Sequence, residues 1–173
     1  DLLEDLAAVD AAQFLRTDIQ RRDRCFLQKQ IGQEVAQAEQ QGLLGPTEIE
    51  RLWRLVQPIF ACAETGPWRL SNHDFYFRNF LELPDGRVAL LDWEVARISC
   101  FEIEHCVSYL WMLLWNHPEW RREFLHQATQ RLKIDQDKFR AALVVNALHQ
   151  AMFVWQDQPA LQAQMIGVLR NAL

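Results

Sequence analysis

Apolar residues recur at helical spacing through most of this sequence. The first forty residues predict two helical pieces, with Leu2, Leu6 and Phe14 on the first. The polar run Arg21-Arg22-Asp23-Arg24 separates the pieces. Residues 31–41 are rich in Gln, Glu and Ala, which form helices well but have little to bury. We therefore expect a solvated helical face there.

Helix signals are also clear in the middle of the chain. Thr47 and Glu50 have the spacing of a capping box, in which the Thr47 side chain caps a helix and the Glu50 side chain bonds back to the Thr47 amide. Ile49, Leu52, Trp53, Val56 and Phe60 then follow the helical period. Pro58 is expected to kink or end this helix, because proline lacks the amide proton and clashes with the preceding turn.

The last third of the chain predicts further helices. Residues 101–115 are apolar almost all round, which indicates a buried central helix. Asn116-His117-Pro118 should break it ahead of a helix over 119–132. Asp135 is placed to cap the next helix, which runs to Trp155, and Gln158-Pro159 is expected to start the final one.

One stretch departs from the helical pattern. Phe80–Leu90 predicts two short strands joined by Pro84-Asp85-Gly86, a turn in which Pro presets φ and Gly accepts positive φ. The predicted fold is therefore mainly α with a small β-hairpin. No repeat, low-complexity tract or domain boundary is visible, so we expect one helical domain over residues 1–173.

The composition of the chain argues against several classes of function. The net charge of −5 argues against a general nucleic-acid-binding surface. No apolar run is long enough to span a bilayer, and no signal peptide is visible, which predicts a cytoplasmic protein without membrane contact. The four scattered cysteines are expected to be buried or free thiols. Since the first residue is not Met, we expect a fragment of a longer gene product.

The hairpin also organises the candidate chemistry. Asp74 and Asn79 precede its first strand, and Asp92 follows its second. Because a hairpin brings its ends together, these oxygen-bearing side chains are expected to converge. Such a set suits a hard cation, and Mg²⁺ is commonly shared between a few carboxylates and substrate phosphates.

Phosphoryl transfer needs such a set: a carboxylate near the acceptor hydroxyl, and metal ligands for the phosphates. Asp74-x4-Asn79 followed by Asp92-Trp93-Glu94 resembles the motifs of the aminoglycoside phosphotransferase / choline kinase-like family, most strongly over residues 70–106. The resemblance implies the C-terminal lobe of a protein-kinase-like fold.

The resemblance also implies roles for single residues. Asp74 would orient or deprotonate a hydroxyl of a small-molecule acceptor, with ATP as phosphoryl donor. Asn79 and Asp92 would hold Mg²⁺ against the nucleotide phosphates, and Trp93 and Glu94 would support the loop by packing and hydrogen bonding.

The chain departs from the family pattern at several positions. The family's His two residues before the catalytic Asp is replaced by Asn72, with His73 adjacent to Asp74. Either Asn72 takes over the hydrogen-bonding role or the loop is rearranged, and His73 is expected to be structural. The family's later Gly-Asp-Pro is replaced by residues 99–101, and Glu104 stands in for the following Asp.

The largest departure is the nucleotide-binding lobe. No strand-rich segment, Gly-rich loop or Val-Ala-x-Lys-like strand precedes residue 70. We therefore expect this chain alone to bind nucleotide poorly and to be inactive without that lobe.

Other interpretations remain open. A pseudokinase or helical interaction module would keep the same lobe without catalysis. Protein-kinase activity is disfavoured by Asp92-Trp93-Glu94 where those enzymes carry Asp-Phe-Gly. A zinc site at Cys100, His105 and Cys106 lacks a fourth ligand. Several tryptophans are expected in the core, although they could instead line an acceptor pocket or hold a cation: Trp111, Trp115, Trp120 and Trp155.

Overall fold

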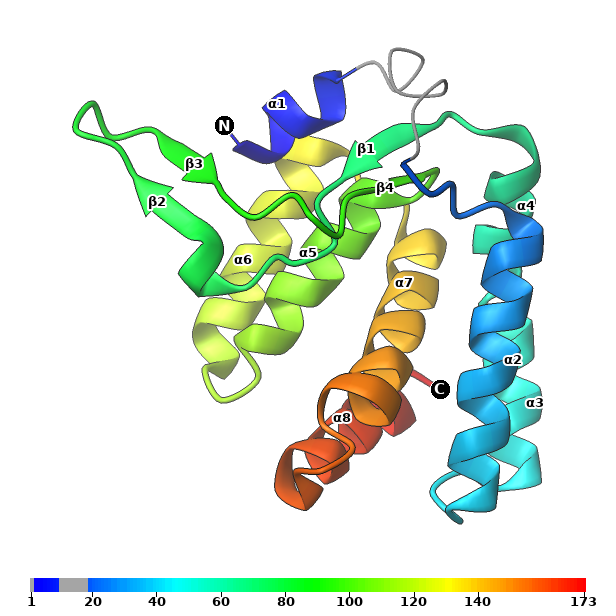
Figure 1. Ribbon diagram of the computed structural model, residues 1–173. Coiled ribbons are helices and arrows are strands. Elements are labelled where there is room, and N and C mark those ends of the chain that lie inside the picture. Colours follow the sequence, from blue (N-terminus) through cyan, green and yellow to red (C-terminus); the bar gives the residue numbers. More distant parts are fainter. Residues whose placement is uncertain (1, 10–18) are drawn as a thin grey trace.

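The computed structural model describes residues 2–9 and 19–173 and is mainly helical (Figure 1). The predicted mainly α fold class with a small hairpin is confirmed. The predicted helical position Phe14 lies outside the described residues. The helices are α1 (Leu2–Ala8), α2 (Arg24–Gln40), α3 (Pro46–Leu55), α4 (Gln57–Thr65), α5 (Glu102–Leu113), α6 (Pro118–Leu132), α7 (Gln136–His149) and α8 (Pro159–Ala172). A 3₁₀ turn, η2 (Phe77–Asn79), and a π-helical turn, η3 (Gln150–Val154), complete them.

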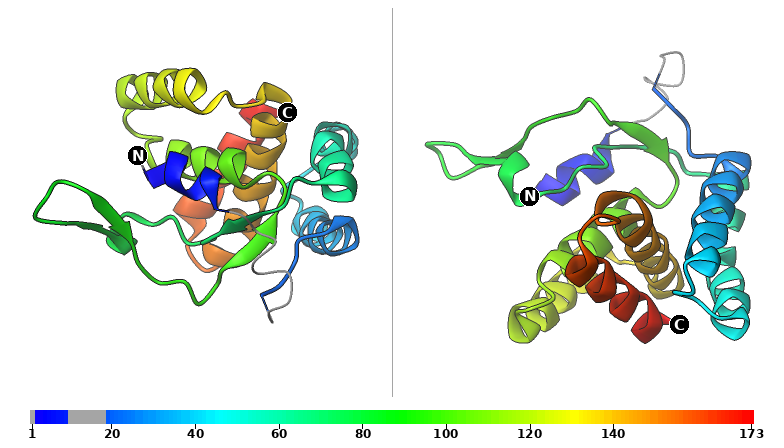
Figure 2. Two further views of the ribbon diagram at one scale, coloured as in Figure 1. Left: turned by 90° about the horizontal axis from the view of Figure 1, so that it is seen from above. Right: turned by 60° about the horizontal axis from the view of Figure 1, so that its bottom comes forward.

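The core is built around α7. This helix packs against α5, α8 and α4, and its residues 141–148 are all buried. Helix α5 buries most of its length, so the predicted buried central helix is confirmed. Figures 1 and 2 show α2, α3 and α4 as a layer beside α7.

Most helix boundaries follow local chemistry. The Asp135 Oδ1 accepts hydrogen bonds from the amides of Asp137 and Lys138, both at 3.0 Å, which confirms the predicted cap. The predicted breaks at Pro58 and Pro118 and the predicted helix start at Pro159 also hold, since each proline lies in the first turn of a new helix.

The predicted Thr47 cap is wrong. Helix α3 starts two residues earlier than that cap implies, with Gly45 as its N-cap and Pro46 in its first turn. The Gly45 amide donates to the Glu48 carboxylate at 2.8 Å. Proline favours the first helical position because it needs no amide partner there, and this preference moves the helix start ahead of Thr47.

The predicted solvated face over residues 31–41 is only half right. Gln33, Ala36 and Glu39 are exposed, whereas Ile31 and Val35 are buried with other residues of α2. Helix α2 packs against both α4 and α7, so one face has to be enclosed. Even the carboxylate-bearing Glu34 lies on that enclosed face, with no exposed area.

The predicted hairpin is present. Strands β2 (Phe80–Glu82) and β3 (Val88–Leu90) pair antiparallel, with Phe80 opposite Leu90. Gly86 takes φ +78° in the turn, as glycine permits. The hairpin projects from the body in Figures 1 and 2.

A second small sheet was not predicted. Strand β1 (Arg69–Ser71) pairs antiparallel with β4 (Arg97–Ser99), although they are far apart in sequence. Each strand has only three residues, too few for an alternating pattern to stand out. This sheet matters because it joins the two ends of the segment that carries the candidate site.

The remaining side-chain predictions have mixed outcomes. The four cysteines are free thiols, three of them buried, as predicted. The prediction that the tryptophans pack in the core is wrong for Trp120, which is 65% exposed.

No helix in residues 2–9 or 19–173 combines the length and hydrophobicity needed to cross a bilayer.

Candidate functional site

The loop between β1 and β2 is closed by the side chain of Asn79. Its Nδ2 donates to the Asp74 carbonyl at 2.9 Å and to the Asp74 Oδ2 at 2.8 Å. The Asp74 carbonyl also accepts from the Tyr76 amide at 2.8 Å. Asp74 and Asn79, which the sequence predicted to converge, therefore lie in direct contact.

Asn72 connects this loop to the far end of the hairpin. Its Oδ1 accepts from the Asp74 amide at 2.8 Å. Its Nδ2 donates to the carbonyls of Leu91, at 3.1 Å, and Asp92, at 2.7 Å. Asn72 has no exposed area, so all these bonds are made away from water. The asparagine that stands in the expected histidine position thus makes the contacts that hold the loop.

The hairpin strengthens the same connection. The Leu91 amide donates to the Asn79 carbonyl at 2.8 Å, directly beyond the last strand pair. Asp92 follows with φ +56°, a conformation that turns the chain sharply. Its side chain is exposed. The backbone of Asp92 is therefore fixed beside Asp74, while its carboxylate faces solvent.

The residues after Asp92 are less enclosed than predicted. Trp93 donates from Nε1 to the Leu90 carbonyl at 2.9 Å, which supports the turn. Glu94 is exposed and lies with Trp93 along a shallow pocket beside Arg97. Trp93 thus has a visible supporting contact, whereas Glu94 faces outward.

The side-chain oxygen atoms of Asn79 and Asp92 could supply some of the ligands of a hard cation. Since Asn79 uses its Nδ2 for Asp74, its Oδ1 is left as an acceptor, and the exposed Asp92 offers a carboxylate. No cluster of three or more His, Cys, Asp or Glu side chains that suits a metal occurs in the described ranges. Asn79 and Asp92 alone would leave most ligand positions to phosphate oxygens and water, an arrangement that Mg²⁺ accepts.

His73 turns away from Asp74. It takes φ +67°, and its Nε2 lies 2.9 Å from the Arg22 Nη1. Its ring stacks on His105, with centroids 4.1 Å apart. Burial, followed by the charges of His105 and Arg22, holds the pKa of His73 well below its usual range. Burial, followed by the charges of Arg22 and His149, does the same to the pKa of His105. Both rings are therefore neutral, and His73 accepts a hydrogen bond from Arg22.

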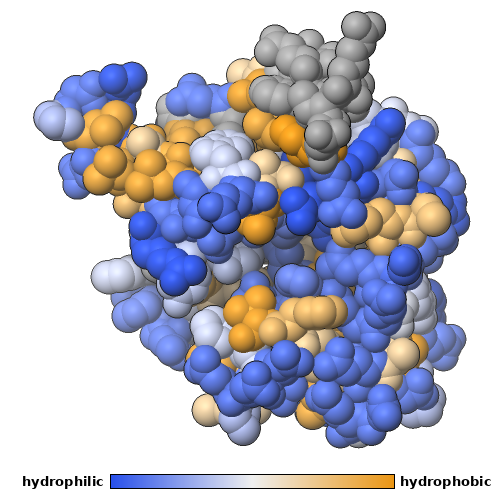
Figure 3. Space-filling model, in the orientation of Figure 1, coloured by the Kyte–Doolittle hydropathy of each residue, from blue (hydrophilic) through white to orange (hydrophobic). Residues whose placement is uncertain are grey.

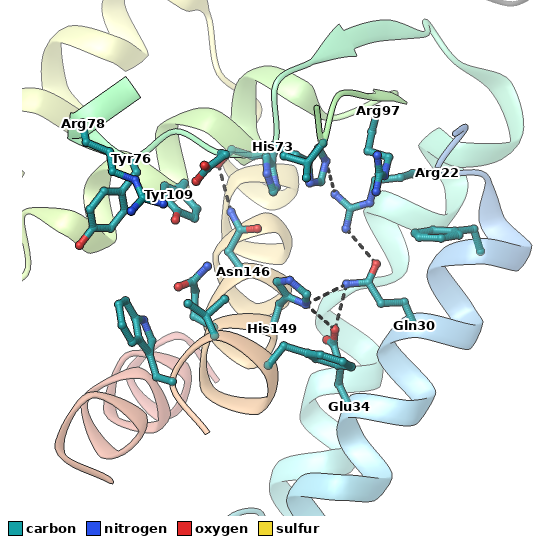
Figure 4. Close-up of a pocket in the computed structure, with 18 residues that line it drawn as sticks. Arg22, Gln30, Glu34, His73, Tyr76, Arg78, Arg97, Tyr109, Asn146 and His149 are labelled. Carbon is teal, nitrogen blue, oxygen red and sulfur yellow. Dashed lines mark hydrogen bonds and ion pairs between the residues drawn. The ribbon is translucent and has the colours of Figure 1, made fainter. Parts of the chain in front are cut away.

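A cavity of about 550 Å³ opens beside Asp74, and a hollow is visible in the middle of the face in Figure 3. Its walls come from the Asp74 loop, α2, α5, α7 and η3 (Figure 4). Burial, reinforced by Asp74, raises the pKa of Tyr109 on this wall to about 12, which keeps its hydroxyl protonated. Polar and charged lining residues are Arg22, Gln30, Glu34, His73, Asp74, Tyr76, Arg78, Arg97, His105, Tyr109, Asn146, His149 and Gln150.

A hydrogen-bonded chain of side chains runs along one wall of the cavity (Figure 4). Arg22 donates to the Gln30 Oε1 at 3.4 Å, and Gln30 donates to the Glu34 Oε1 at 2.9 Å. The His149 Nδ1 lies 2.8 Å from the same oxygen. The second carboxylate oxygen of Glu34 is buried without a partner. These hydrogen bonds thus fix the positions of the Arg22 guanidinium and the Glu34 carboxylate, which carry opposite charges, on this wall.

Sequence reasoning missed this wall. It assigned Arg22 to a polar run, yet Arg22 is only 2% exposed. The residues of the wall come from the segment before α2, from α2 itself and from His149 at the end of α7. Only the folded chain brings these segments together. The available signal for Glu34 was its helical spacing from Ile31 and Ala38, which places the three residues on one face of the helix.

The π-helical turn continues the cavity wall beyond His149, whose ring stacks on that of Phe153 with centroids 5.3 Å apart. It extends α7 beyond His149 and places Phe153, Val154 and the following Trp155 along the cavity. Such turns are frequent at functional sites, because the extra residue redirects side chains. Of the tryptophans expected in the core, Trp155 therefore borders the cavity.

Comparisons with family models, with curated proteins and with solved structures found no match for this chain.

Proposed function

We propose that this chain carries the catalytic and Mg²⁺-binding part of a phosphotransferase that moves a phosphoryl group from ATP to a hydroxyl of a small molecule. The proposed fold is the C-terminal lobe of a protein-kinase-like enzyme. The observation that carries the proposal is the double connection made by Asn72, from the Asp74 amide to the Asp92 carbonyl. This connection holds the backbone of Asp74 close to that of Asp92, which supports a single site formed by residues 74–79 and 92–94.

In this proposal Asp74 accepts the proton of the acceptor hydroxyl. Asp74 lies on the cavity wall, where a small molecule can approach it. Asn79 binds the Asp74 Oδ2 and so orients the carboxylate, leaving Oδ1 for the hydroxyl. A carboxylate positioned in this way speeds proton transfer and alignment of the acceptor.

Asn79 and Asp92 would hold the metal on the other side of Asp74. Bound Mg²⁺ would neutralise phosphate charge during transfer. Asp92 does not line the cavity, so nucleotide phosphates and acceptor would approach Asp74 from different sides. In-line transfer would then place the acceptor hydroxyl, with Asp74 beside it, and the leaving oxygen on opposite sides of the phosphorus atom.

The second candidate is a non-catalytic relative of the same fold. It is favoured by residues 2–9 and 19–68, which form helices and contribute no strand-rich nucleotide lobe. Turnover would require nucleotide-binding elements beyond those described residues. The whole gene product that contains this chain is therefore the right material for an assay.

The test is phosphoryl transfer to a panel of hydroxylated small molecules, with ATP and GTP as donors. We expect turnover, and Asp74→Asn or Asp92→Asn should lower kcat/KM by about 10²-fold or more. Asp85→Asn in the exposed hairpin turn is the matched control and should retain activity. A folded wild-type protein without turnover would favour the non-catalytic candidate, and full activity of Asp74→Asn would reject the enzyme assignment.

A further inference from the structure

Arg22 and Arg97 come to the same cavity from neighbouring backbone segments. The Arg22 amide donates to the Ile98 carbonyl at 2.8 Å, and the Ile98 amide donates to the Gln20 carbonyl at 3.0 Å. These bonds fix the segment before α2 alongside β4. Both guanidinium groups line the cavity, and Figure 4 shows them close together on one wall.

Neither arginine has a carboxylate partner. Arg22 is bonded to neutral His73 and Gln30, and Arg97 gives one hydrogen bond, from Nη1 to the Ala96 carbonyl at 2.8 Å. Within the described part of the chain, neither forms an ion pair. Arg22 is 2% exposed, so water cannot solvate its charge freely.

The carboxylates of the cavity already have donors. The Glu34 Oε1 accepts from Gln30 and lies beside His149, and its other oxygen is enclosed by protein and out of reach of a ligand. The Asp74 Oδ2 accepts from Asn79. These carboxylates therefore form no ion pair with Arg22 or Arg97, and the arginine pair brings uncompensated positive charge to the cavity.

Two like charges in a partly dry cavity repel each other. Burial lowers the pKa of Arg22 to about 10, and the neighbouring Arg97 acts in the same direction against the opposing charges of Glu34 and Glu102. An oxyanion between the guanidinium groups would remove this repulsion. Guanidinium groups match carboxylate and phosphate oxygens in shape and bind them through charge-assisted hydrogen bonds.

We propose that Arg22 and Arg97 form a subsite for an anionic group, a carboxylate or a phosphate, on the acceptor molecule. The assignment of that molecule as an acceptor rests on the proposed function, whereas anion binding at the arginine pair does not. A cavity of about 550 Å³ is the size of a small-molecule site. The acceptor is then a small hydroxylated acid or sugar phosphate, with its hydroxyl toward Asp74.

The arginine pair belongs to the cavity side of Asp74. Asp92, the proposed metal ligand, lies outside the cavity. Arg78 also lines the cavity, but it is exposed at the rim, 5.3 Å above the Tyr76 ring, and is not part of the pair. The subsite therefore selects the acceptor and not the nucleotide.

The test is calorimetric titration of the purified chain with inorganic phosphate, D-glycerate and choline chloride. We expect phosphate or glycerate to bind and choline not to bind, and the tighter of the two anions identifies the group that the subsite accepts. Arg97→Gln removes the charge, keeps a polar side chain and should weaken anion binding about tenfold or more. Arg54→Gln, at an exposed helix position, is the matched control and should bind like wild type.

Several results would overturn the subsite. These are absence of binding by both anions, equal affinities of wild type and Arg97→Gln, equal weakening by Arg54→Gln, or displacement of the anion by ATP. Circular dichroism on Arg97→Gln confirms that the variant is folded. Anion binding that depends on Arg97, in a gene product without turnover, would reject the proposed enzyme and keep the subsite.

Discussion

The two flanks of Asp74 differ in exposure and in origin. On the hairpin side Asp92 is exposed, and apolar Leu81 and Leu91 face solvent. On the cavity side Arg22 and Glu34 are buried and bound in a hydrogen-bonded chain. Figure 3 shows hydrophobic surface gathered on the projecting hairpin, whereas both hydrophilic and hydrophobic surface borders the hollow.

This difference separates the two tasks that the proposed function requires. An exposed carboxylate can take up a metal ion with phosphates and water without a large desolvation cost. A buried arrangement of charges is fixed before a ligand arrives, so it can select the ligand by charge and shape. Asn72 joins Asp74 to the hairpin flank, because its side-chain amide bonds to the Asp74 amide and to the carbonyls of Leu91 and Asp92.

The largest expected effect comes from breaking that connection. Asn72→Ala would leave the Asp74 amide and the carbonyls of Leu91 and Asp92 without their buried partner. We expect a loss of about 2–3 kcal/mol in the free energy of unfolding, measured by urea denaturation.

Asn116→Ala, at an exposed position, is the matched control and should stay within about 0.5 kcal/mol of wild type. A stability of Asn72→Ala equal to that of the control would show that Asp74 is not held to the hairpin flank through this side chain.

A smaller effect distinguishes the cavity flank by its pH dependence. The folded pKa of His73 is held below its unfolded value by burial and by the charges of His105, Arg22, Arg97 and His149. As pH falls below about 6.5, the unfolded chain takes up a proton that folded His73 does not, so stability decreases. The slope is at most about 1.4 kcal/mol per pH unit for this one group.

Glu102 works in the opposite direction. Burial and Glu104 raise its folded pKa, so its contribution to stability is lost as pH rises.

Comparison of wild type with the His73→Asn variant isolates the contribution of the histidine, because asparagine tolerates the positive φ at this position. Denaturation at pH 7.5 and 5.5 should show a weaker acid loss in His73→Asn than in wild type. Equal losses would mean that His73 titrates as it does in the unfolded chain.

The hairpin flank was predictable because its chemistry is local. Pro84-Asp85-Gly86 specifies a turn, and the strands beside it bring Asn79 next to Leu91. The helix breaks at prolines are encoded in the same local way. The start of α3 was missed only because Pro46 and Glu48 outweigh the capping box of Thr47 and Glu50.

The cavity flank was not predictable because its residues meet only in the folded chain. Arg22, Glu34, Arg97 and His149 lie on separate elements, and no spacing between them is fixed by a helix or strand period. Strands β1 and β4, which bring the arginine segment to Asp74, are also too short to leave a pattern. Burial of Arg22 and Glu34 further contradicts the usual exposure of charged residues.

Metal binding by the hairpin flank tests the central claim most directly. Mn²⁺ is added to the ¹⁵N-labelled chain, and paramagnetic broadening of amide signals is recorded. We predict selective broadening at Asn79 and Asp92 that disappears in Asp92→Asn and persists in Asp85→Asn, the matched change in the hairpin turn. Uniform broadening along the hairpin, or broadening at Asn79 that persists in Asp92→Asn, would contradict a metal site formed by these two residues.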